Sequence, residues 1–124
     1  MKVAVIGCTH AGTAAILNLK RIYPDSDVTV FERNDNISFL SCGIALYVGG
    51  VVKDAQGLFY CSPDKLKELN VDTKMRHNVE SADIKGKKII AKNLETGVEI
   101  EHTFDKLIIT SGSWPIIPRI EGID

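Results

Sequence analysis

One cysteine stands out as the residue best placed to do chemistry. Cys42 lies within residues 37–47, an apolar stretch broken by small residues, which predicts a loop that enters a helix near the cysteine. A helix N-terminus stabilises a thiolate, and a thiolate can be oxidised reversibly to a sulfenic acid. Tyr47 stands where a C-x4-C redox pair would have its second cysteine. The pattern therefore predicts a single reactive thiol; the alternative is a small buried hydrophobic residue.

A small-residue turn forms the second candidate site. Gly7 and Gly12 occupy the first and third positions of a G-x-G-x-x-G pattern, with Thr9 in the middle. A turn from a strand into a helix aims free N–H groups and the helix dipole at an anion, which suits a pyrophosphate. Glu32, 20 residues after Gly12, could accept both hydroxyls of a ribose and repel a 2′-phosphate. We predict a dinucleotide site; the alternative is an ordinary βαβ unit.

These candidates need a βαβ unit to position them. Residues 2–6 form a short apolar run that indicates a buried parallel strand, and helix formers follow Gly12 until Pro24. Residues 27–33 predict a second strand that ends near Glu32. Residues 51–60 indicate a linker, and Ser62 then caps a helix over residues 63–70 that precedes a third parallel strand at 71–75.

The pattern changes to polar–apolar alternation after residue 77. Residues 78–84, 87–92 and 98–104 predict a three-stranded antiparallel β-meander with one face in water. Residues 105–110 predict a return to a buried strand, and the turn at residues 111–115 follows it. Such turns line ligand sites in open α/β sheets. The fold class is therefore α/β, a Rossmann-like domain with a parallel sheet and an antiparallel meander.

Composition sets the broad class. The 124 residues, 44% of them hydrophobic, indicate one domain spanning residues 1–124. A net charge of −1 argues against nucleic acid or an anionic membrane as partner and favours small molecules. The sequence shows neither a membrane span nor a signal peptide, so we expect a cytoplasmic protein. Three cysteines without metal-ligand spacing predict no disulfide framework and no metal site.

Four ordered segments carry a family resemblance. They are VIGCTHAG at the first turn, Glu32, ISFLSCGIALYVGG at 37–50 and FDKLIITSGSWP at 104–115. Together they resemble the flavoprotein NADH oxidase and NADH peroxidase family, the single-cysteine branch of the FAD-dependent pyridine nucleotide–disulfide oxidoreductases. Ser41 resembles oxidases and peroxidases rather than coenzyme A disulfide reductases, and residues 44–47 look most like the water-forming NADH oxidases.

The resemblance implies roles for individual residues. Cys42 would be the redox centre, and His10 the active-site histidine, kept neutral by the helix start; the alternative for His10 is a solvated helix-start residue. The residues implied to contact FAD are Gly7, Cys8, Thr9, His10, Ala11, Gly12, Glu32, Arg33, Ser41, Cys42, Val79, Thr110, Ser111, Gly112 and Ser113. For Val79 and residues 110–113, the alternative is that they form an ordinary strand and turn without a role in binding FAD. The thiols of Cys8 and Cys61 match no functional position and are expected to be structural.

The implied activity is oxidation of NADH through FAD. In the water-forming branch, dioxygen takes electrons from the flavin, and the cysteine thiolate and sulfenic acid cycle converts the peroxide to water. The alternatives are an NADH peroxidase and a nucleotide-binding module without activity. Members of the family also carry an NADH-binding domain and a C-terminal dimer domain, so the resemblance covers an N-terminal, FAD-binding part of a homo-oligomer whose NADH site lies outside this chain.

Overall fold

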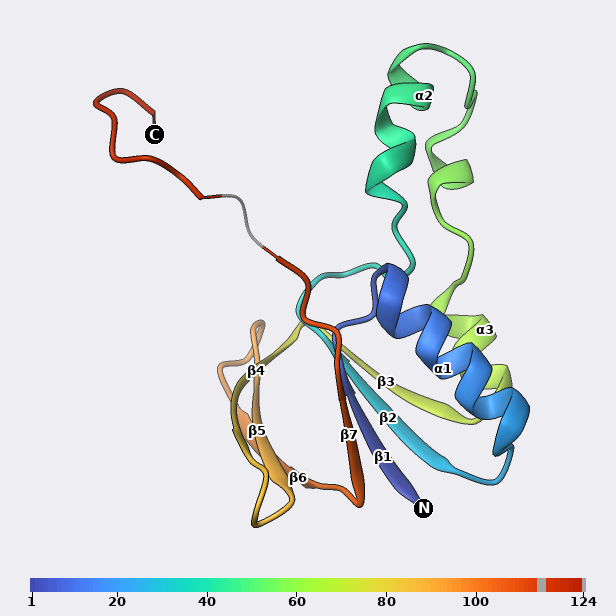
Figure 1. Cartoon of the computed structure of the whole chain (residues 1–124), viewed down its shortest axis with the longest axis vertical. Helices are drawn as coiled ribbons and strands as arrows, with labels where there is room; N and C mark the ends of the chain where they lie inside the picture. The colour runs from blue at the N-terminus through green and yellow to red at the C-terminus, as the bar shows by residue number, and fades with distance from the viewer. Residues whose placement is uncertain (114–115, 124) are drawn as a thin grey trace.

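Two sheets form the frame of the computed structural model (Figure 1). It describes residues 1–113 and 116–123, so Trp114 and Pro115 of the predicted turn, and Asp124, lie outside the described residues. A parallel sheet has the strand order β3-β2-β1-β7, and an antiparallel sheet has the order β4-β5-β6. The strands are β1 (Lys2–Ile6), β2 (Asp27–Glu32), β3 (Val71–Met75), β4 (His77–Asp83), β5 (Lys88–Asn93), β6 (Glu99–Thr103) and β7 (Lys106–Ile109). The predicted α/β class with its antiparallel meander is confirmed.

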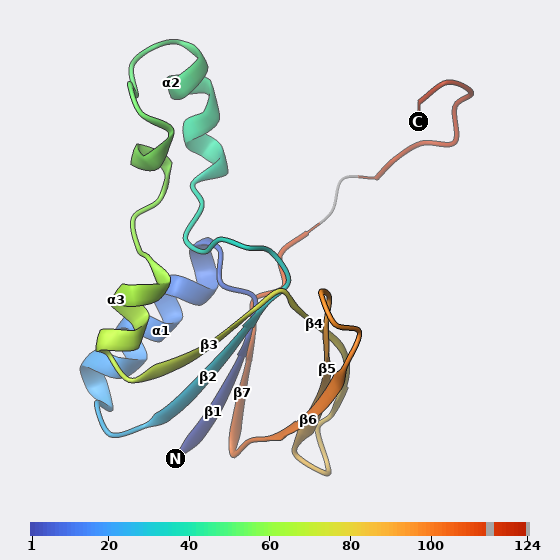
Figure 2. The same ribbon diagram turned by 180° about the vertical axis from the view of Figure 1, so that it is seen from behind.

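Helices cover one face of the parallel sheet and the meander covers the other (Figures 1 and 2). The helices are α1 (His10–Ile22), α2 (Ile44–Val48) and α3 (Pro63–Glu68), with 3₁₀ helices η1 (Ser41–Gly43) and η2 (Ala55–Leu58). Val3 and Val5 pack with Ile16 of α1 and Leu66 of α3 on one side of the sheet. Each side chain of this size, fully buried, contributes about 1.5–3 kcal/mol. The core therefore fixes the ends of β1 and β2, where the candidate site lies.

Two predictions about the elements need correction, one on where a helix begins and one on whether a strand is buried. Helix α1 begins at His10, so Gly12 lies inside its first turn instead of preceding the helix. The last strand is not buried: Ile109 is 60% exposed, because β7 is the edge strand of the parallel sheet and has β1 as its neighbour on one side only. An apolar run thus predicted the strand correctly but not its position at the edge.

Residues 37–60 form an arm that projects from the body of the domain (Figures 1 and 2). The arm consists of η1, α2 and η2, and an isolated β-bridge between Phe39 and Phe59 holds its two sides together at the base. The prediction of a loop entering a helix near Cys42 is confirmed, whereas the predicted linker at 51–60 contains η2 and the buried Leu58. Within residues 1–113 and 116–123, no helix has the length and apolar character needed to cross a bilayer.

A partly buried histidine links the two sheets. The ring of His102 in β6 packs edge-on against Phe31 in β2, with a centroid separation of 5.2 Å. Its Nε2 has no hydrogen-bond partner among the described residues. Burial lowers the pKa of His102 below its usual value of 6.5. The charged groups that face it are Lys2, Asp27, Asp72 and Lys74.

This lowered pKa predicts an acid-sensitive stability. Because the unfolded chain takes up a proton near pH 6.5 and the folded chain resists it, the contribution of His102 is complete above that pH and is lost as the pH falls through the lower folded pKa. His102→Gln should flatten the decline in urea-unfolding free energy that accompanies a fall in pH below about 6.5. The exposed His10→Gln is the matched control, and an unchanged slope in His102→Gln would contradict the assignment.

Candidate functional site

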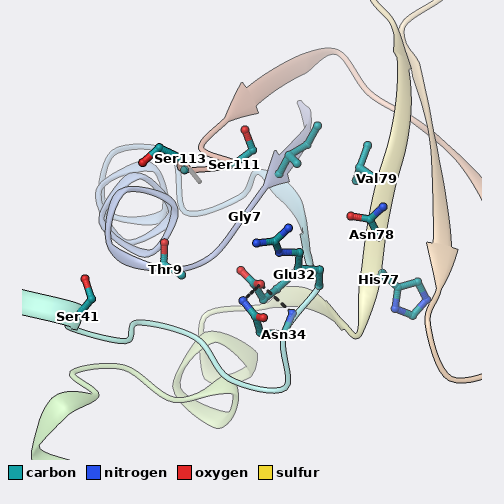
Figure 3. A pocket seen from close by; sticks show the side chains of 13 residues that line it. Gly7, Thr9, Glu32, Asn34, Ser41, His77, Asn78, Val79, Ser111 and Ser113 are labelled. Carbon is teal, nitrogen blue, oxygen red and sulfur yellow. Dashed lines mark hydrogen bonds between the residues drawn. The ribbon is translucent and has the colours of Figure 1, made fainter. Parts of the chain in front are cut away.

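A pocket of about 360 Å³ lies at the carboxyl ends of the parallel strands. Figure 3 shows its wall, which is built from the ends of β1, β2 and β7 and the start of β4. The predicted residues that line it are Gly7, Thr9, Glu32, Arg33, Ser41, Val79, Ser111, Gly112 and Ser113. Residues from five separate segments of the chain therefore meet in one cavity.

The turn after β1 is held so tightly that two positions admit only glycine. Gly7 has a φ of +89°, and a Cβ there would meet the carbonyl oxygen of Thr110. A Cβ on Gly12 would meet the carbonyl oxygen of Gly7 and lie 2.8 Å from Thr110 Oγ1. Thr110 closes this contact, because its hydroxyl donates to the carbonyl oxygens of Ile6 and Gly7 at 2.8 and 2.9 Å. Thr110 thus acts from behind the turn, outside the pocket lining.

The carboxylate of Glu32 is buried beside this turn. Its side chain is 3% exposed and lines the pocket. The backbone N–H of Cys8 donates to Oε2 at 2.7 Å, and the backbone N–H and side-chain amide of Asn34 donate to Oε1 at 2.9 and 2.8 Å. A carboxylate offers about four lone-pair directions. Glu32 is therefore rigidly placed at the pocket wall, and its contact with a ribose stays a prediction.

The anion site rests on the start of α1. The backbone N–H of Cys8 is directed at Glu32, so it is not among the amides left to bind an anion. The first amides of a helix have no carbonyl partner within the helix, and here they belong to His10, Ala11 and Gly12. Helix α1 has 13 residues, so its dipole adds to these donors. These three residues lie outside the pocket lining, and their contact with a ligand stays a prediction.

Four lining residues were missed by the sequence predictions. They are Ile6, Asn34, His77 and Asn78. Asn78 and Val79 point into the pocket from β4 (Figure 3), whereas Nδ1 of His77 lies 2.6 Å from the carbonyl oxygen of Met75. Alternation alone does not say which face of a meander strand meets the parallel sheet. Asn34 could have been found, since it follows a buried strand at its carboxyl end.

Cys42 lies at the base of the arm and is exposed. The alternative that it is a buried hydrophobic residue is therefore wrong. It belongs to η1, directly before α2, and its neighbour Ser41 reaches the pocket wall while Cys42 itself does not line it. The buried Leu58 packs beside the next residue, because a Cβ on Gly43 would lie 2.7 Å from Leu58 Cδ2. The expected thiolate character stays a prediction.

The other two cysteines are buried. Burial raises the pKa of the Cys8 thiol to about 11, so this thiol stays protonated near neutral pH. Burial also raises the pKa of Cys61. A thiol without thiolate character is a poor nucleophile. The sulfur of Cys8 is fully enclosed and cannot touch a ligand, so any contact from this residue must come from its backbone.

His10 is exposed and stands beside the arm. The hydroxyl of Tyr60 donates to the carbonyl oxygen of His10 at 3.0 Å, and the two rings meet edge to face with centroids 5.6 Å apart. These contacts connect the start of α1 with the arm that carries Cys42. The active-site role of His10 stays a prediction. No group of three or more His, Cys, Asp or Glu side chains within the described ranges is arranged to hold a metal ion.

Comparison with known proteins places this geometry in a family. A family model described as pyridine nucleotide–disulphide oxidoreductase matches residues 1–124. An NADH oxidase of Enterococcus faecalis is 59% identical over 124 residues, covering 100% of this chain and 28% of that protein. An NADH oxidase of Mycoplasma pneumoniae is 46% identical over 121 residues, covering 98% of this chain and 25% of that protein. The chain thus spans about a quarter of the length of these relatives.

Solved structures give the same result. A water-forming NADH oxidase from Lactobacillus brevis, described as bound to NADH, matches with a TM-score of 0.95 and 55% identity. The match covers 100% of this chain and 28% of that chain. An NAD-dependent persulfide reductase from A. fulgidus matches with a TM-score of 0.92 and 31% identity, over 100% of this chain and 24% of that chain. This chain belongs to the pyridine nucleotide–disulphide oxidoreductase family.

Proposed function

We propose that this chain is the FAD-binding part of a water-forming NADH oxidase. The observation that carries the proposal is the buried Glu32 carboxylate, hydrogen-bonded at 2.7 Å to the amide of Cys8 in the glycine turn. This bond fixes a ribose acceptor and a pyrophosphate site in one rigid frame. The similarity to water-forming NADH oxidases supports the choice of reaction.

The described residues fit FAD. Gly7 and Gly12 let the turn, the start of α1 and Thr110 pack closely, which fixes the direction of the helix N-terminus. The amides at the start of α1 would hold the pyrophosphate, Glu32 would hold the adenosine ribose, and Val79 with residues 111–113 would border the remainder. When bound, FAD would supply a two-electron carrier between NADH and dioxygen.

Cys42 would then act on the peroxide formed from dioxygen. Its thiolate would attack one peroxide oxygen, the O–O bond would break, and the departing hydroxide would be protonated to water. Two electrons from a second NADH and a proton would return the sulfenic acid to thiolate and release its oxygen as water. Of the three cysteines, Cys42 is the exposed one, which this reaction requires.

The test is the product formed by a serine variant of the complete protein. Cys42→Ser should retain NADH consumption and the flavin absorption band but release hydrogen peroxide, from near none to about one equivalent per NADH, because the peroxide-reducing thiol is gone. Peroxide is measured with a peroxidase-coupled dye under air. Cys61→Ser is the matched control, since that thiol is buried and away from the pocket lining.

Three outcomes would contradict the proposal. A Cys42→Ser protein that still forms water alone would remove the thiol from the reaction. A wild-type protein that oxidises NADH with added peroxide but not with dioxygen would be an NADH peroxidase, and one without a flavin band in its visible spectrum would not be a flavoprotein.

A further inference from the structure

The hydroxyl of Ser38 joins the two sides of the arm where the arm leaves the domain. Its Oγ donates to the carbonyl oxygen of Cys61 at 2.6 Å and accepts from the N–H of Cys61 at 2.9 Å. Ser38 is fully buried. Because one side chain satisfies both a donor and an acceptor of the opposite main chain, it replaces a backbone pair of a β-ladder. Ser38 therefore closes the base of the arm through its side chain.

The main chain of Ser38 is directed at the turn after β1. Its φ of +59° is a left-handed conformation, which is uncommon outside glycine. The other described non-glycine residues with a positive φ, Asn70, Arg76 and Lys87, are exposed, whereas Ser38 is buried. The N–H of Ser38 donates to the carbonyl oxygen of Cys8 at 2.8 Å. Backbone conformations of this kind persist where the surrounding structure determines them, and they are frequent at functional sites.

A second contact attaches the returning side of the arm to the same short segment. The hydroxyl of Tyr60 donates to the carbonyl oxygen of His10 at 3.0 Å. Cys8 and His10 flank Thr9, so both contacts end just before and at the start of α1. Figures 1 and 2 show the base of the arm beside this end of α1. At Ser38, the outgoing side of the arm, its returning side and the segment that begins the anion site therefore meet.

The hydroxyl, and not the backbone, distinguishes serine at this position. A glycine would adopt the left-handed φ without strain, but it would leave the buried N–H and carbonyl groups of Cys61 without the partner that Ser38 provides. An alanine would lose the same two hydrogen bonds and keep the unfavourable backbone. Alanine and glycine variants of Ser38 thus share the loss of the hydroxyl and differ in backbone strain.

Cys42 depends on this junction for its place. It lies four residues after Ser38 on the outgoing side of the arm, and its neighbour Ser41 lines the pocket. A tilt of the arm about its base would therefore move the thiol relative to the pocket wall. A reacting group that is misplaced by about 1 Å can lose on the order of 10²-fold in rate.

We propose that Ser38 is a positioning residue for Cys42: its hydroxyl fixes the arm against the start of α1 and thereby holds the thiol next to the pocket wall. The inference rests on the proposed function, because it concerns the delivery of Cys42 to the FAD site. Ser38 itself does not line the pocket and acts through the arm.

The experiment follows Cys42 in Ser38→Ala and Ser38→Gly variants of the complete protein. Alkylation of Cys42 by iodoacetamide is followed from the mass of its peptide, with and without FAD. A cofactor in the pocket lies against Ser41, so FAD should slow alkylation of the next residue about tenfold or more in wild type and less than about twofold in both variants. The peroxide released per NADH by the FAD-loaded variants should rise from near none to about a tenth of an equivalent or more.

Ser26→Ala is the matched control. Ser26 is also buried, and its hydroxyl donates to the carbonyl oxygen of Tyr23 at 2.7 Å, but it precedes β2 at the end of the sheet opposite the pocket. This variant should leave the shielding of Cys42 and the peroxide yield unchanged. Urea-unfolding midpoints are measured for all variants. An effect of stability would follow these midpoints, whereas an effect of the hydroxyl should be equal in both Ser38 variants.

The outcomes separate the inference from the proposed function. If FAD shields Cys42 equally in wild type and in both Ser38 variants, or if Ser38→Gly behaves as wild type, the inference is overturned while the proposed function stands. If wild type has no flavin band, or if FAD does not shield Cys42, the proposed function fails and the inference fails with it. Should neither Ser38 variant fold, Tyr60→Phe decides, since it removes the second contact from an exposed residue. It should reduce the shielding, and unchanged shielding would overturn the inference.

Discussion

Gly12→Ala should abolish FAD binding while the chain stays folded. The new Cβ would meet the carbonyl oxygen of Gly7 and lie 2.8 Å from Thr110 Oγ1. The oxygen cannot move away freely, because Gly7 is held by its own N–H, which donates to Phe31 at 2.8 Å, and by the Thr110 hydroxyl. The start of α1 must therefore shift away from β1, and the phosphate-facing amides shift with it.

Helix propensity acts in the opposite direction and identifies the cause. Within a helix, alanine is favoured over glycine by about 1 kcal/mol, so a loss of stability at Gly12 must come from the clash. Overpacking of this kind costs about 1–3 kcal/mol, occasionally more, which a domain with about 5–15 kcal/mol of stability survives.

Gly57→Ala is the matched control for this substitution. Its nearest neighbour would be a methyl group of Val52 at 3.2 Å, which a rotation of the side chain relieves, and Gly57 does not line the pocket. Urea unfolding and FAD titration of both variants form the measurement. A Gly12→Ala protein that keeps stoichiometric FAD at wild-type stability would show that the turn tolerates a side chain and would refute the need for close packing of α1 against the turn after β1.

Local sequence signals predicted the helices and strands well, because each signal reflects a physical interaction between neighbouring residues. Ser62 was expected to cap the helix beginning at Pro63, and its hydroxyl does accept from the N–H of Lys65 at 3.2 Å. The third strand was predicted at residues 71–75 and is found there, because its start follows a helix end at a turn residue, Asn70, with a φ of +54°. Each of these signals involves only a few neighbouring residues, so it can be recognised from the sequence alone.

The site was predicted less completely because its walls come from distant segments. The sequence spacing correctly predicted Glu32 at the end of β2. Its hydrogen-bond partners, Cys8 in the turn and Asn34 in the next loop, depend on how the side chains are oriented, which the spacing does not give. Asn78 comes from the meander, and its approach to the pocket depends on how the antiparallel sheet packs on the parallel one. No local pattern encodes that packing. Thr110 shows the same limit, since the hydrogen bonds of its hydroxyl to Ile6 and Gly7 across the sheet have no local sequence signal, and its contact with FAD stays a prediction.

The 124-residue chain alone should not catalyse hydride transfer from NADH to FAD. The described part of the chain has one glycine turn that opens a helix beside an acidic ribose acceptor, at Gly7 to Gly12 with Glu32. Under the proposed function this frame is occupied by FAD, and one frame accommodates one dinucleotide. NADH then has no comparable frame in these residues to hold its nicotinamide against the flavin ring.

The expected size of this effect follows from the loss of positioning. Holding two reactants in a productive geometry contributes on the order of 7–11 kcal/mol to a reaction, and without it the rate approaches that of the reactants free in solution. Under anaerobic conditions, NADH added to the chain with FAD should bleach the flavin absorption no faster than NADH added to free FAD. A longer protein that carries this chain together with a second βαβ unit should bleach it many orders of magnitude faster, and it serves as the positive control.

Rapid bleaching by the short chain would have one of two causes, and Glu32→Gln separates them. The substitution keeps the shape of the side chain but removes its charge, so it weakens whichever ribose Glu32 holds. If it raises the NADH concentration needed for half-maximal bleaching and leaves FAD affinity intact, the single frame serves NADH and its assignment to FAD is wrong. If it weakens FAD alone, NADH docks on another surface of the domain, and the positioning of hydride donor and flavin does not require a second dinucleotide fold.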